Sequence, residues 1–141
     1  MHKLSENLFF KFGEVTSGLG AETSDTLTTA TFVNMENYDV VGVYGIASEV
    51  ASGSTVTLKL YEATGADGSG SATITGASDT FTSTHVTDLG DVFAEVRAGA
   101  LSAGYQYVGA KLSTDNGSGT EEAAMFFILG RPRYGQATLV E

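Results

Sequence analysis

The oxygen-rich segment STDNGSGTEEA, residues 113–123, is the stretch whose residue types come closest to a metal or phosphate site. An EF-hand calcium loop needs oxygen ligands at alternating positions, glycine at the sixth and glutamate at the twelfth. Counted from Asp115, the third, fifth and sixth positions hold Gly117, Gly119 and Thr120, so this pattern fails. A phosphate loop would need a Gly-Lys-Ser or Gly-Lys-Thr step, whereas two glutamates follow here and would repel an anion. We therefore expect a turn between two strands, with a loose surface cation site as the alternative.

Acid–base and nucleophilic chemistry has few candidate residues. The two histidines are His2 and His85, and Ser83, His85 and Asp88 lie too close along one strand and turn to indicate a catalytic triad, whose members converge in space. Carboxylates that could pair for glycoside hydrolysis are Glu49, Glu62, Asp91 and Glu95. Nothing in the sequence sets any two of them at a working separation. The sequence predicts no catalytic residue, cofactor or metal, and we expect a protein that is not an enzyme.

Fourteen tyrosines and phenylalanines, six and eight respectively, could instead form a sugar-binding platform. Tryptophan is absent, and most of these aromatic residues lie in strand-like runs where the core would hold them. A carbohydrate-binding module is therefore an alternative rather than the expected function.

The charge balance excludes several kinds of partner. Seven basic and 17 acidic residues give a formal net charge of -10, which opposes binding to nucleic acid or an anionic membrane. There is no cysteine for a disulfide framework. The longest early apolar run, Leu8 to Phe10, is too short for a membrane helix or a secretion signal, so we expect neither.

Eighteen glycines, one proline and many β-branched residues predict an all-β chain. In residues 54–63, Val56, Leu58 and Leu60 alternate with polar residues, as in a strand with one buried face. Residues 39–48 and 123–130 are apolar on both faces, which indicates strands that are central under a second layer or buried at a subunit contact.

Further strands are expected in shorter runs separated by Gly, Ser and Asp turns. They cover residues 29–35, 72–75, 80–85, 91–101 and 105–112. The run at 91–101 could also be a helix, but Val92, Ala94 and Val96 alternate and Gly99 would weaken a helix interior, so we prefer a strand. The whole pattern predicts a single jelly-roll-like β-sandwich of about eight antiparallel strands.

The two ends of the chain are expected to extend from this sandwich. Residues 13–28 are polar and weakly periodic, so we divide the chain into an N-terminal strand and polar arm at 1–28, a sandwich at 29–131 and a tail at 132–141. The tail begins at Pro132, which stops a strand.

The C-terminal part of the sequence holds three consecutive motifs: a YVG strand at Tyr107–Gly109, a Gly- and Thr-rich turn at Asp115–Thr120, and an apolar strand ending in Gly-Arg-Pro-Arg-Tyr at Met125–Tyr134. In these motifs the chain resembles small head proteins of tailed bacteriophages. Members with an assigned role are similar to capsid decoration, or cement, proteins. The resemblance implies a small β-domain on the outside of the head, often a trimer, that clamps major capsid protein subunits.

This resemblance implies a structural virion protein, made in the host cytoplasm, whose partners are the major capsid protein and further copies of itself. We predict subunit or capsid contacts at Phe9, Phe10, Tyr44, Phe126, Arg131, Arg133 and Tyr134. The alternatives are a head-tail joining or tail protein, and the carbohydrate-binding module. A cement protein stabilises the shell by binding only the closed lattice, so that its binding free energy adds to the stability of that lattice.

Overall fold

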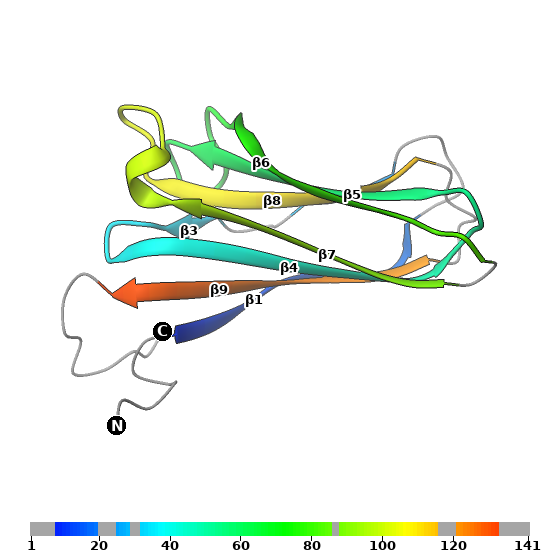
Figure 1. Ribbon diagram of the computed structural model, residues 1–141. Coiled ribbons are helices and arrows are strands. Elements are labelled where there is room, and N and C mark those ends of the chain that lie inside the picture. Colours follow the sequence, from blue (N-terminus) through cyan, green and yellow to red (C-terminus); the bar gives the residue numbers. More distant parts are fainter. Residues whose placement is uncertain (1–7, 20–24, 29–31, 86–87, 116–120, 133–141) are drawn as a thin grey trace, which may run out of the picture.

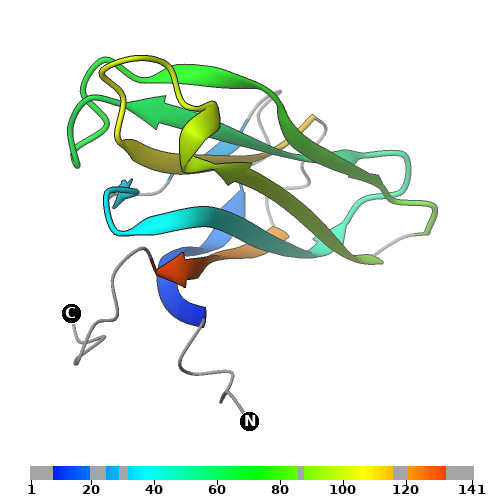
Figure 2. The same ribbon diagram turned by 60° about the vertical axis from the view of Figure 1, so that its left-hand side comes forward.

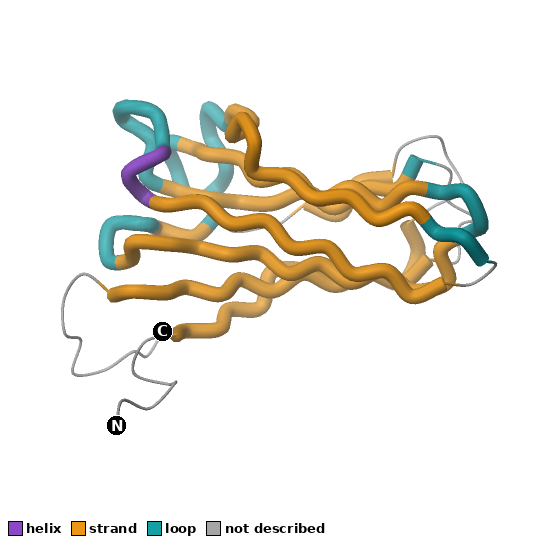
Figure 3. The backbone as a smooth tube through the Cα atoms, in the orientation of Figure 1, coloured by secondary structure: helices purple, strands orange, loops and turns teal. Residues whose placement is uncertain are grey.

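Most of the described chain is β-strand, arranged as two antiparallel sheets stacked face to face (Figures 1 and 3). The computed structural model describes residues 8–19, 25–28, 32–85, 88–115 and 121–132. One sheet contains, in spatial order, β1 (Leu8–Leu19), β9 (Glu121–Pro132), β4 (Tyr38–Val50) and β7 (Asp88–Arg97). The other contains β2 (Asp25–Thr28), β8 (Tyr107–Thr114), β5 (Thr55–Ala63) and β6 (Ala72–Thr82), with β3 (Val33–Asn34) also paired to β8. A 3-10 turn, η1 (Ala98–Ala100), follows β7.

The strand order is that of a jelly roll. Both β2 and β3 pair with β8, so they share one strand position and each sheet has four positions. The chain crosses between the sheets at most connections, for example from β4 to β5 and from β6 to β7 (Figure 2). All strand pairs are antiparallel. The expected single all-β sandwich of about eight strands is confirmed.

The core lies between the sheets and follows the alternation in the sequence. Val56, Leu58 and Leu60 on β5 are fully buried, whereas Lys59 between them is exposed. Facing them, Val41 and Val43 on β4 and Phe127 on β9 are fully buried as well. Removal of these apolar surfaces from water is the main force that holds the two sheets together.

Two expectations about individual strands are settled by the structure. The run at 91–101 is a strand, β7, followed by η1, as the alternation favoured over a helix. The prediction of separate strands at 72–75 and 80–85 was wrong, because β6 is continuous through Gly76. Gly76 has a φ of 80° and lies in a bulge that interrupts the pairing with β5 between Lys59 and Tyr61. The glycine taken as a turn signal is a bulge inside a strand.

The expected N-terminal arm is also corrected. Residues 13–19 continue β1 and pair with β9 as far as Leu19 and Glu121, and residues 25–28 form β2 on the opposite sheet. Backbone hydrogen bonds to a neighbouring strand need no apolar alternation, which explains why a polar segment forms a strand here. Residues 133–141, most of the expected tail, lie outside the described residues.

Candidate interaction surface

The outer side of the four-stranded sheet carries a row of aromatic and aliphatic side chains. On β4 and β9, Val43 and Phe127 point into the core, so the alternate residues Tyr44 and Phe126 point outward. The register places Phe126 opposite Tyr44, and Tyr44 opposite Phe93 on β7. We call this surface the aromatic face and define it by Phe10, Tyr44, Ile46, Phe93, Phe126 and Ile128.

Two members of the aromatic face are strongly exposed. Phe10 on β1 retains 61% of its surface and Phe93 retains 44%, and the nearby Leu89 on β7 retains 69%. The remaining four are half-buried against their neighbours. Exposed apolar side chains that are contiguous on a sheet are characteristic of a surface that binds another macromolecule.

Tyr44 is fixed on this face by a hydrogen bond. Its hydroxyl donates to Oδ2 of Asp91 on the neighbouring strand, at 3.1 Å. This hydrogen bond is the main cause that raises the pKa of Tyr44 above its ordinary value of 10.0, with desolvation and the negative charge of Asp91 adding to it. Tyr44 is therefore neutral at physiological pH and presents an aromatic ring whose polar end is already satisfied.

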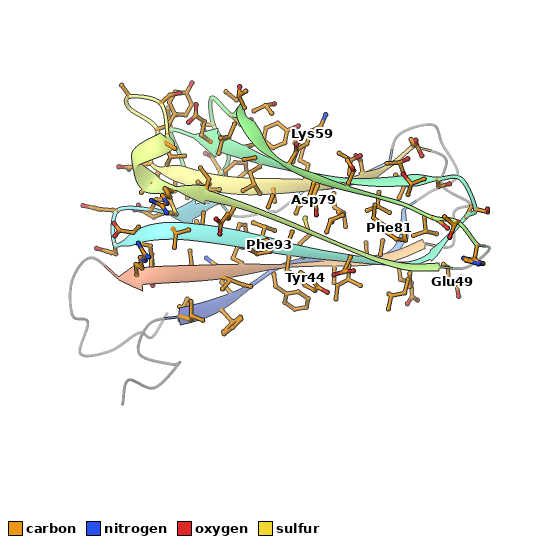
Figure 4. All side chains as sticks on the ribbon, in the orientation of Figure 1. Tyr44, Glu49, Lys59, Asp79, Phe81 and Phe93 are labelled. Carbon is orange, nitrogen blue, oxygen red and sulfur yellow. The ribbon has the colours of Figure 1, made fainter. Side chains whose placement is uncertain are left out.

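Phe93 is positioned by a glycine. A Cβ atom at Gly42 would lie 2.6 Å from Cζ of Phe93, so the phenyl ring lies over the Gly42 backbone. Gly42 is opposite Glu95, the next outward residue of β7 after Phe93. Figure 4 labels Tyr44 and Phe93 on these two neighbouring strands. The glycine thus lets an aromatic ring from the edge strand cover the central strand.

Charged residues border the aromatic face along β7. Asp91, Glu95 and Arg97 are exposed and alternate with the buried Val92, Ala94 and Val96. Arg131, near the end of β9, is exposed and has a positive φ of 52°. The face therefore combines an apolar centre with a charged border, as protein interfaces do.

The structure groups some of the predicted contact residues and separates others. Phe10, Tyr44 and Phe126 lie together on the aromatic face, and Arg131 lies beyond it at the end of β9. Phe9 instead packs against the core, since it is registered opposite the buried Leu129. Arg133 and Tyr134 lie outside the described residues.

Sequence reasoning missed Phe93 as a member of the surface. Ile46 and Ile128 lie in the runs 39–48 and 123–130, for which it allowed a subunit contact, but they were not named as contact residues. The signal for Phe93 was present, because the alternation that buries Val92 and Ala94 must turn Phe93 outward. Alternation alone does not show which residues lie beside Phe93. Its position beside Tyr44 follows from the register of β7 against β4.

Among the residues considered for catalysis, Glu62 and Glu95 line one pocket between β6 and β7. The buried Ser83 Oγ lies 2.7 Å and 3.3 Å from the main-chain oxygens of His85 and Val50, so this hydroxyl holds the local backbone. The Asp88 side chain and residues 116–120, where a turn or a loose cation site was expected, lie outside the described residues. Within the described part of the chain, no group of three or more His, Cys, Asp or Glu could hold a metal ion. No helix there is long and apolar enough to span a membrane.

Comparisons with known proteins show the fold. No protein-family model and no curated protein matches the chain. It is similar to a chain in the structure of the infectious bursal disease virus Gx strain, with a TM-score of 0.52 and 9% identity over 89% of this chain and 32% of that one. It is also similar to dimeric latent PorU from Porphyromonas gingivalis, with a TM-score of 0.50 and 9% identity over 89% of this chain and 13% of that one.

A third similar structure is the VP2 subviral particle of infectious bursal disease virus, with a TM-score of 0.49 and 12% identity over 89% of this chain and 32% of that one. The chain thus spans no more than a third of these three chains. At identities this low, the likeness to the first two structures shows the fold alone.

Proposed function

We propose that this protein is a structural component of a tailed-phage virion that binds the outside of the capsid as a decoration protein. The observation that carries the proposal is the aromatic face, which exposes Phe10 and Phe93 on an otherwise strongly acidic chain. Such a surface supports binding to protein better than binding to nucleic acid. The sequence resemblance supplies the kind of partner, the major capsid protein, and a non-enzymatic role.

In this proposal, the aromatic face forms the contacts between copies of this chain. Aromatic residues are enriched at protein interfaces and supply large contact areas at little cost in side-chain entropy. Assembly into a trimer, the state implied by the resemblance, would cover this face and leave the charged end near Arg131 for a neighbouring shell protein. The viral chain that shares this fold is compatible with the proposal.

Quantitative mass spectrometry of particles from the phage that encodes this chain tests the proposal. We expect a copy number on the scale of the major capsid protein, and digestion of this chain by protease added to intact heads. A few copies per particle would overturn the decoration role in favour of a head-tail joining or tail protein. Absence from the particle would overturn a virion role altogether.

A further inference from the structure

A pocket of about 410 Å³ opens between the free edges of the two sheets, beside η1. One wall is the bulged part of β6, from Thr73 to Ala77, and the other is β7 from Glu95 to Arg97. At Gly76, the centre of the bulge, no atom other than those of its chain neighbours lies within 4 Å of where a Cβ would be. Bulges often lie next to binding sites, and this volume falls in the range of small-ligand pockets.

Glu62 is the buried charged group of this pocket. Inward-facing positions of β5 carry Val56, Leu58 and Leu60, and the next inward position carries Glu62, which is only 6% exposed. Its Oε2 accepts a hydrogen bond from the Ser102 amide at 2.8 Å. Among the described residues, no cation lies within ion-pair distance of this carboxylate. A carboxylate on a side chain with so little exposed surface is ordinarily paired with a positive charge.

The surroundings of Glu62 define what kind of cation fits. The buried apolar side chains of Ile74, Ala77 and Val96 line the pocket beside the carboxylate. Arg97 and Glu95 also line it and oppose each other in charge, so the negative charge of Glu62 remains in excess. A short alkyl chain ending in an ammonium group would place methylenes on the apolar wall and its charge on Glu62.

We propose that the Glu62 pocket binds an alkylammonium group, the chemistry shared by a lysine side chain of a partner protein and by a small free alkylamine. The inference rests on the pocket and is independent of the proposed capsid role. The proposal also assigns a function to the β6 bulge, which forms one wall of the pocket that Glu62 lines.

The test is an NMR titration of the protein with n-butylammonium chloride, with 1-butanol as the uncharged control. We expect a saturable shift of the Ser102 amide and nuclear Overhauser effects from the ligand methylenes to Ile74, with 1-butanol at least tenfold weaker. The Glu62→Gln variant should lose the shift, whereas Glu49→Gln, which removes an equal charge at an exposed site, should retain it. Figure 4 labels Glu49 at the end of β4, at the other end of the sandwich from η1.

The outcomes separate the two sources of the ammonium group. Binding of Nα-acetyl-lysine methylamide as tight as that of butylammonium would point to a lysine of a partner, and binding of the free amine alone would point to a small molecule. No saturable shift in the wild type, or an unchanged shift in Glu62→Gln, would overturn the proposal. If Glu62→Gln does not fold, equal binding of butylammonium and 1-butanol to the wild type would overturn it.

Discussion

Oδ2 of Asp79 on β6 accepts a hydrogen bond from the backbone N–H of Phe93 on β7 at 2.9 Å, joining the edge strands of the two sheets. Figure 4 shows both residues labelled on these neighbouring edges. Asp79 is registered opposite the buried Leu58, so it is an inward-pointing charge on an edge strand. Natural sheets use such charges to prevent their edges from pairing with other chains.

Replacement of Asp79 by alanine should destabilise the protein by about 1–3 kcal/mol, because a hydrogen bond between a charged acceptor and a backbone donor is lost. Urea unfolding would measure this change. Asp79→Asn keeps a side-chain oxygen and should lose less than the alanine variant. Equal unfolding midpoints for wild type and Asp79→Ala would show that this contact contributes nothing.

The hydrogen bond from Tyr44 to Asp91 predicts a specific titration. Because the pKa of Tyr44 is raised in the folded state, its contribution to stability is complete below the unfolded value of about 10 and is lost as pH rises through the folded pKa. Absorbance titration of wild type minus Tyr44→Phe should give a midpoint above 10. Asp91→Asn should lower that midpoint, and a midpoint that does not respond would disprove the assigned cause.

Substitution by alanine should destabilise the protein to different extents at two glycines that are covered by phenyl rings. A Cβ at Gly90 would overlap the ring of Phe81, which is packed against the core, so Gly90→Ala should cost about 1–3 kcal/mol. A Cβ at Gly42 would meet Phe93, whose exposed ring can swing away, so Gly42→Ala should cost less than about 1 kcal/mol. Thermal unfolding of the two variants compares them, and equal losses would contradict this account of the rings.

Glu49 has a left-handed backbone with a φ of 57°, in the β4 bulge between Ala47 and Val50. This conformation costs a residue with a Cβ about 1–2 kcal/mol, and glycine escapes that cost. Glu49→Gly should therefore raise the free energy of unfolding by up to about 1 kcal/mol over Glu49→Ala, which removes the same carboxylate but keeps the strain. A Glu49→Ala variant as stable as Glu49→Gly would show that the bulge is unstrained.

The sequence predicts the sandwich and its core well because burial imposes alternation. Residues 54–63 show this plainly, since Val56, Leu58 and Leu60 are the residues that the structure buries. The second half of β1 was not predictable in this way, because residues 13–19 are held by main-chain pairing with β9. Gly76 was taken as part of a turn between two strands because glycine often marks a turn, whereas β6 accommodates it as a bulge.

The candidate surface was predictable only in part. The apolar character of both faces of 39–48 and 123–130 identified Tyr44 and Phe126, but the addition of Phe93 required the register of β7. Phe9 and Phe10 are adjacent in sequence, and only the register against Leu129 and Ile128 shows that Phe9 faces the core and Phe10 faces outward. The Glu62 pocket depends on a bulge and a chain crossing that no local pattern specifies.

The most direct test of the central claim is the solution mass of the full chain and of the Phe10→Ser, Phe93→Ser double variant, by light scattering after size exclusion. Both side chains are exposed, so their replacement should leave the circular dichroism spectrum of the folded chain unchanged. The account predicts a trimer of 14.6 kDa chains for the wild type and a monomer for the variant. A wild type that is monomeric at all concentrations, or a double variant with the mass of the wild type, would contradict the role given to the aromatic face.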